Sequence, residues 1–95
     1  VRFRAVVIPQ DVQVEESVRR KVFAPDDAAT LDLDAPDRIF GAALRARGIS
    51  TYDLLPGLRR AAEHERLYKP QDGHWGAAGN RAAADLLARD VFGMR

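Results

Sequence analysis

The pattern of apolar and polar positions predicts two strands separated by helices. Residues 2–9 begin with alternating side chains and become a continuous β-branched run that Pro9 stops. Such a run is typical of a strand whose far end is buried on both faces, as in a parallel sheet. A second short β-prone run covers residues 49–54. We therefore predict two strands, far apart in the sequence.

Apolar residues at helical spacing predict four helices around these strands. The expected helices cover about residues 11–23, 37–47, 56–65 and 76–92. In the second helix, Ile39 and Leu44 are expected on the inner side, and Asp37 is expected to cap its start. The stretch between the first two helices contains two prolines and four aspartates and is predicted to be an acidic loop.

The order strand–helix–helix–strand–helix–loop–helix predicts an α/β fold with two parallel strands. Two strands make a poor sheet, and the apolar first strand requires neighbours that this sequence does not supply. The sequence also begins at Val1 rather than methionine and enters the first strand almost at once. We therefore expect residues 1–95 to be a single unit, the C-terminal segment of a larger three-layer fold.

Composition and charge remove several classes of function. The 15 Lys and Arg residues nearly balance the 14 Asp and Glu residues, and both halves of the sequence are close to neutral. No basic face is implied, so binding to nucleic acid or to an anionic membrane loses its electrostatic support. The first apolar run is far shorter than the roughly 20 residues that a bilayer requires. With no cysteine, disulfides, thiolate catalysis and Cys-based zinc sites are excluded.

One segment, residues 68–81, contains side chains suited to catalysis. Asp72 and His74 are separated by Gly73, which allows a sharp bend, so both side chains can turn toward the same place. Histidine transfers protons near neutral pH, and it works best when a carboxylate fixes its tautomer and stabilises the imidazolium. In open α/β folds, ligands usually bind at the carboxyl edge of the sheet. The sequence thus predicts an acid–base pair at that edge.

The stretch from Asp72 to Asn80 resembles a known catalytic block. It reads Asp-Gly-His-Trp-Gly-Ala-Ala-Gly-Asn, and the last block of the SGNH/GDSL hydrolase superfamily typically reads Asp-Gly-His-Trp-Asn-x-x-Gly-His. The order of segments along nearly all 95 residues resembles the bacterial alginate O-acetyltransferase-like branch, whose Asp-x-His spacing this sequence shares. Gly76 and Asn80 depart from the commoner Asn and His. The resemblance implies a flavodoxin-like three-layer α/β/α fold.

The resemblance also implies a reaction and roles for two residues. His74 would be the general base of a serine esterase or O-acyltransferase, and Asp72 would orient it. The implied substrate is an acyl ester, with acetyl on a carbohydrate as the leading expectation, reached through the parent protein. The implied reaction needs neither a metal nor a cofactor, and the resemblance is compatible with a periplasmic or secreted location.

The other half of such a site is missing from the sequence. In the family, the nucleophilic serine and the oxyanion-hole residues belong to other blocks. Ser17 is expected within a helix and Ser50 near the start of a strand, whereas Asn80 belongs to the last helix. None of these positions suits a nucleophile or an oxyanion donor, so this chain alone is predicted to be inactive.

Each candidate residue also has a plainer interpretation. In the plainer interpretation, Asp72 serves only as the N-cap of the last helix, and His74 is a surface loop residue without a catalytic role. Gln10, Asp53 and Trp75 are weaker pocket candidates, because the first two follow predicted strands and the third adjoins the pair. For Asp53, capping of the next helix is the plainer role, and for Trp75 it is anchoring of the last helix in the core.

His64 and the chain as a whole each have an alternative interpretation. His64 is expected to be exposed at a helix end, and no spacing motif supports a metal site that it would form with Asp72 and His74. The whole chain would alternatively be a non-catalytic α/β remnant or interaction module that keeps the terminal block for packing.

Overall fold

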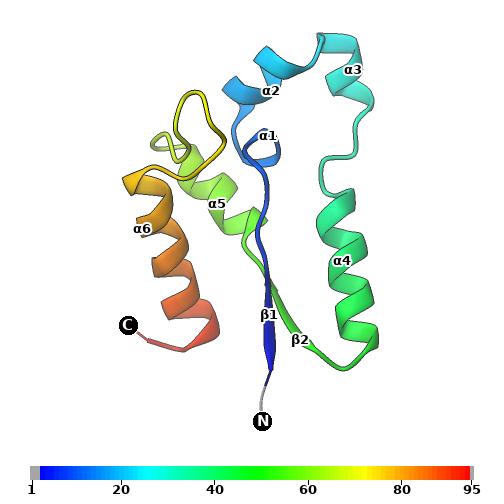
Figure 1. The fold of residues 1–95 in the computed structure, drawn as a ribbon, viewed down its shortest axis with the longest axis vertical. Helices are drawn as coiled ribbons and strands as arrows, with labels where there is room; N and C mark the ends of the chain where they lie inside the picture. Colours follow the sequence, from blue (N-terminus) through cyan, green and yellow to red (C-terminus); the bar gives the residue numbers. More distant parts are fainter. Residues whose placement is uncertain (1–2, 95) are drawn as a thin grey trace.

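The computed structural model describes residues 3–94, which form a mixed α/β arrangement around one pair of parallel strands (Figure 1). Strand β1 (Arg4–Val7) pairs with β2 (Ser50–Asp53), and the register places Arg4 opposite Ser50 and Val7 opposite Asp53. The helices are α1 (Asp11–Val14), α2 (Glu16–Val22), α3 (Pro25–Thr30), α4 (Ala35–Ala46), α5 (Leu55–Ala62) and α6 (Ala77–Leu86), followed by the π-helical segment η1 (Leu87–Val91).

The helices lie on both sides of the strand pair. Figure 1 shows α4 on one side and α5 and α6 on the other, with α1 beyond the carboxyl end of β1. The Arg4 guanidinium donates a hydrogen bond to the carbonyl oxygen of Val91 at 2.8 Å, and the Tyr52 hydroxyl donates one to Asp90 at 2.6 Å, so η1 is tied to both strands. The predicted α/β class with two parallel strands is confirmed.

The helices differ in detail from the four that were predicted. The first is divided into α1 and α2 at Glu15, whose backbone is extended (φ −106°, ψ 119°). The predicted acidic loop contains α3, which begins with Pro25 at its first position, where proline is favoured. In α4, Asp37 and Gly41 are buried whereas Ile39 is 64% exposed, so the predicted inward position of Ile39 is wrong.

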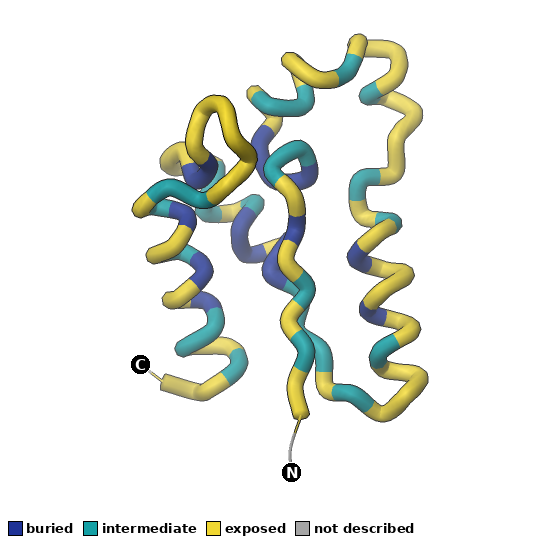
Figure 2. Tube along the Cα trace, viewed as in Figure 1, coloured by how far each residue is buried: buried dark blue, intermediate teal, exposed yellow. Residues whose placement is uncertain are grey.

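The core lies on the α5 and α6 side of the strands, where the buried residues gather in Figure 2. Its buried apolar residues are Val14, Leu54, Leu55, Leu58, Leu67, Tyr68, Ala83 and Leu86. Close packing of α5 on α6 depends on Gly57, because a Cβ there would lie 2.6 Å from Cδ2 of Leu86. None of the helices within residues 3–94 combines the length and the apolar character needed to cross a membrane.

Strand β1 is an edge strand in the described part of the chain. Val6 is 38% exposed and Ile8 is 63% exposed, so the prediction that both faces of this strand are buried is not met by residues 3–94. The Cα radius of gyration is 14.3 Å, whereas a compact domain of this length is expected near ~12 Å. The arrangement is therefore open on the free side of β1.

Candidate active site

Residues 67–76, which lead into α6, form a loop whose two ends are joined by backbone hydrogen bonds and whose first residues are buried. Leu67 and Tyr68 are buried, and Tyr68 bridges Trp75 in antiparallel fashion. The N–H of Lys69 donates to the carbonyl oxygen of His74 at 2.8 Å, and the N–H of Gly76 donates to that of Leu67 at 2.9 Å. These two bonds fix both ends of the exposed stretch that contains Asp72 and His74.

This loop lies beside the turn that follows β1. The Tyr68 hydroxyl donates to the carbonyl oxygen of Pro9 at 3.2 Å. Gly73 has a φ of +71°, and a Cβ at this position would lie 3.6 Å from Oδ2 of Asp11. The loop therefore stands at the carboxyl end of β1, the edge of a parallel sheet at which ligands usually bind.

Asp72 and His74 face one another across a short gap. Oδ1 of Asp72 lies 3.5 Å from Nδ1 of His74 and accepts a hydrogen bond from the His74 backbone N–H at 2.9 Å. The backbone bond is the main reason why the pKa of Asp72 is below its usual value. The His74 side chain is 83% exposed. The 3.5 Å between the carboxylate and the imidazole is longer than an ordinary hydrogen bond, so the recorded bond between the two residues is the one from the His74 backbone.

The plainer interpretation of Asp72 as a helix cap is wrong. The N-cap position of α6 is Gly76, and no side chain caps this helix end. The Asp72 carboxylate instead closes the turn at its own position by accepting the His74 N–H. Its placement is therefore determined by the loop and by His74, not by α6.

The weaker pocket candidates have structural roles. Gln10 is exposed, and its backbone N–H donates to Oε1 of Gln13 at 2.8 Å at the start of α1. Trp75 is half-buried against the core, and its Nε1 is buried without an acceptor. Asp53 accepts the Leu55 N–H at 3.0 Å just before α5, but the N-cap position of this helix is Leu54, so the predicted capping role of Asp53 is wrong in its position. Asp72 and His74 form the catalytic candidate, and Asp53 belongs to a separate cluster.

That cluster joins the end of β2 to α4 through two carboxyl groups. Asp37 is only 6% exposed, and its Oδ1 accepts a hydrogen bond from Nε2 of Gln13 at 2.8 Å. Burial, followed by the hydrogen-bonded Asp37 carboxyl, raises the pKa of Asp53 to about 6. The negative charges of Asp37 and Asp34 nearby also disfavour ionisation of Asp53, which raises its pKa in the same direction. The prediction that Asp37 caps the start of α4 is wrong, because the N-cap position is Asp34, and no pattern in the sequence indicates the contact with Asp53.

The carboxyl pair predicts a pH-dependent stability. The folded chain binds the Asp53 proton with a pKa of about 6, above the ordinary 3.8, so the free energy of unfolding should fall as pH rises through this window. Asp53→Asn retains an acceptor for the Leu55 N–H and offers Asp37 an amide donor. We expect its unfolding free energy, measured by urea denaturation, to change less with pH and to exceed that of wild type above about pH 6. Parallel pH profiles would contradict this prediction.

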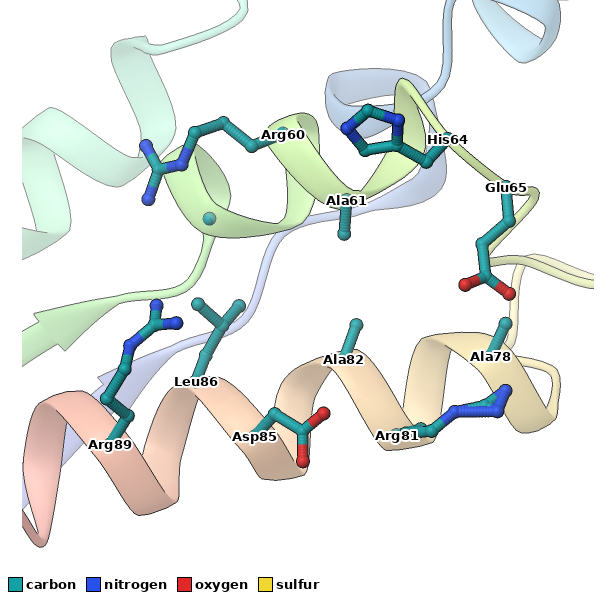
Figure 3. A pocket seen from close by; sticks show the side chains of 11 residues that line it. Arg60, Ala61, His64, Glu65, Ala78, Arg81, Ala82, Asp85, Leu86 and Arg89 are labelled. Atoms are coloured by element: carbon teal, nitrogen blue, oxygen red, sulfur yellow. The ribbon is translucent and has the colours of Figure 1, made fainter. Parts of the chain in front are cut away.

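A groove of about 430 Å³ lies between α5 and α6, away from the Asp72 and His74 loop. Figure 3 shows Ala61 and Ala82 facing one another across it, with arginines along both walls. His64 lines this groove, whereas Asp72 and His74 do not. Within residues 3–94, no group of three or more His, Cys, Asp or Glu side chains is arranged to bind a metal ion. The groove is therefore separate from the Asp72 and His74 loop.

A parallel strand pair with helices on both sides and an Asp-x-His loop at its carboxyl edge is consistent with an SGNH hydrolase-like α/β arrangement. A family model described as "SGNH hydrolase-like domain, acetyltransferase AlgX" matches residues 5–93. Because this match covers nearly the whole chain, the protein belongs to that acetyltransferase and esterase family. Comparisons with curated proteins and with solved structures gave no match.

Proposed function

We propose that residues 1–95 provide the acid–base half of a serine-dependent acyl-transfer site. His74 is the general base and Asp72 is the carboxylate that orients it. The observation that supports these roles is the 3.5 Å approach of Oδ1 of Asp72 to Nδ1 of His74 at the carboxyl edge of the strands. Membership of the acetyltransferase family supplies the class of reaction.

The proposed reaction transfers an acyl group in two steps. His74 takes the proton from a serine hydroxyl as the serine oxygen attacks the ester carbonyl, and it then gives that proton to the leaving alcohol. In the second step, His74 deprotonates water or a sugar hydroxyl, which takes the acyl group from the serine. The lowered pKa of Asp72 keeps its carboxylate ionised, so its negative charge stabilises the imidazolium in both steps.

The serine comes from outside residues 1–95 in this proposal. Ser17 lies exposed in α2, and Ser50 lies exposed at the start of β2, the strand end opposite to the His74 loop. Asn80 is exposed on α6, and the proposal gives it no role in stabilising an oxyanion. The 83% exposure of the His74 side chain leaves room for a serine and a substrate supplied by other parts of the site.

The proposal also treats these residues as one part of a larger three-layer domain. The free edge of β1 carries exposed apolar side chains, Val6 and Ile8, which a further strand with its covering helix would bury. The large radius of gyration agrees with an arrangement that lacks part of its packing. The substrate class proposed for the complete site is an acetyl ester of a carbohydrate.

A fluorophosphonate probe, which labels activated serines, tests the proposal on the full gene product. We expect one labelled serine outside residues 1–95, mapped by peptide mass spectrometry. His74→Ala should slow labelling at least ~100-fold, because the probe reacts with a serine that a base has activated. His64→Ala, which replaces the other histidine, is the control and should label at the wild-type rate.

The outcomes of the labelling experiment are distinct. Labelling at Ser17 or Ser50 would reject the proposed origin of the nucleophile. A full gene product that neither labels nor hydrolyses p-nitrophenyl acetate would reject the catalytic proposal and favour a non-catalytic module.

A further inference from the structure

Glu15 is a buried carboxylate in the extended break between α1 and α2. It is 6% exposed, and its Oε2 accepts a hydrogen bond from the backbone N–H of Leu67 at 3.1 Å. Burying a carboxylate is costly unless hydrogen bonds compensate, so an apolar side chain would suit this position better for packing alone. The bond to Leu67 is therefore the specific contribution of Glu15.

Leu67 is the base of the loop that contains His74. Its N–H is bonded to Glu15, and its carbonyl oxygen accepts the N–H of Gly76 at 2.9 Å, so both backbone groups of Leu67 are fixed. Lys69 N–H donates to the carbonyl oxygen of His74 at 2.8 Å two residues further along. A shift of Leu67 would thus be transmitted to His74 from both ends of the loop.

The surroundings of Leu67 leave it little freedom once these bonds are made. Leu67 is 1% exposed, and Gly79 of α6 approaches its carbonyl oxygen so closely that a Cβ would lie 2.3 Å away. Tyr68, the next residue, is bonded to Pro9 at the end of β1. The N–H of Leu67 is held by Glu15, which is 52 residues away in the sequence, between α1 and α2.

We propose that Glu15 is a positioning residue for proton transfer by His74. It acts through Leu67, whose backbone fixes the position and orientation of the loop that contains Asp72 and His74. This inference rests on the proposed function of His74. Glu15 touches no reacting atom; it determines where the imidazole stands relative to a serine brought to the same edge. Because catalysis is sensitive to displacements near 1 Å, loss of this bond should lower kcat more than it changes KM.

The test uses variants of the full gene product that differ in whether they can accept the Leu67 N–H. Glu15→Gln retains an oxygen acceptor at the same distance, whereas Glu15→Asp is too short and Glu15→Ala has none. We expect Glu15→Ala and Glu15→Asp to lower kcat for p-nitrophenyl acetate about 10- to 100-fold with KM within about 2-fold of wild type. Glu15→Gln should recover to within about 3-fold of the wild-type kcat.

Gln13→Ala is the matched control. Gln13 is also 6% exposed and lies in the same turn, but its side chain bonds to Gln10, Asp37 and the carbonyl oxygen of Leu33, none of which belongs to the His74 loop. Hydrogen exchange measured by mass spectrometry should rise in residues 66–76 for Glu15→Ala and in residues 33–40 for Gln13→Ala. This readout needs no catalytic turnover.

The kinetic and exchange results together decide whether Glu15 positions the His74 loop. Equal effects of Glu15→Ala and Gln13→Ala on exchange and kcat would reject it, because Glu15 would then be only a packing residue. If Glu15→Ala does not fold, Glu15→Asp decides, and wild-type kcat in that variant would overturn the proposal. A wild-type protein without esterase activity would reject the proposed function, while unchanged exchange in residues 66–76 of Glu15→Asp would reject the anchor itself.

Discussion

Replacing His74 with alanine in the full gene product is expected to lower kcat for ester hydrolysis by about 10³- to 10⁴-fold and to leave KM almost unchanged. In the proposed reaction the imidazole is the group that accepts the serine proton, and its Nδ1 lies 3.5 Å from Oδ1 of Asp72. The His74 side chain is 83% exposed, so its removal should not disturb the packing of the chain. Steady-state kinetics with p-nitrophenyl acetate measure both constants.

The control for this prediction is His64→Ala. His64 is the other histidine of the chain, exposed just after α5 in the groove between α5 and α6, and its loss should leave kcat within about 2-fold of wild type. Circular dichroism would establish that both variants remain folded. A His74→Ala protein with near wild-type kcat would show that another group is the general base.

Short-range features of the site could be predicted from the sequence. Asp72 and His74 are separated by one residue, and Gly73 permits the tight bend, so their approach depends on local chain geometry alone. The β-branched run that ends at Pro9 likewise identifies β1 through the local side-chain pattern. In both cases the determining interactions lie within a few residues of one another.

Contacts between distant segments could not be predicted in the same way. Glu15 and Leu67 are 52 residues apart, and Gln13 and Asp37 are 24 apart, so no local pattern indicates that either pair will meet. A buried polar side chain among the valines of α1 was the available signal, but helical spacing alone does not give its partner. The pairing of Asp53 with Asp37 was missed for the same reason.

The orientation of α4 illustrates how such a contact overrides an apolar pattern. Helical spacing favours Ile39 on the inner side, but the bond between Gln13 and Asp37 requires the Asp37 face to turn inward. Ile39 is then left 64% exposed. The start of α3 at Pro25 was a missed local signal, since proline followed by two acidic residues is favourable in a first helical turn.

The second large effect is expected from Gly79→Ala in α6. A Cβ at this position would lie 2.3 Å from the carbonyl oxygen of Leu67 and 2.8 Å from Cβ of Trp75. Leu67 cannot retreat easily because Glu15 and Gly76 bond its two backbone groups, so α6 itself must move. Alanine would gain about 1 kcal/mol in helix propensity, and overpacking of a close contact costs typically 1–3 kcal/mol or more.

With a backbone atom as the obstacle, we expect the steric cost to exceed that gain and Gly79→Ala to lower the free energy of unfolding by about 2 kcal/mol in urea denaturation. Gly76→Ala is the matched control, because a Cβ there would lie 3.9 Å from the same Leu67 oxygen, an ordinary contact. Because alanine is a poorer N-cap than glycine, we expect its unfolding free energy to fall by less than about 1 kcal/mol, a smaller loss than that of Gly79→Ala. Equal stability of the two variants would show that α6 does not press on Leu67. A larger loss in Gly79→Ala than in Gly76→Ala would establish the contact through which the position of α6 constrains the His74 loop.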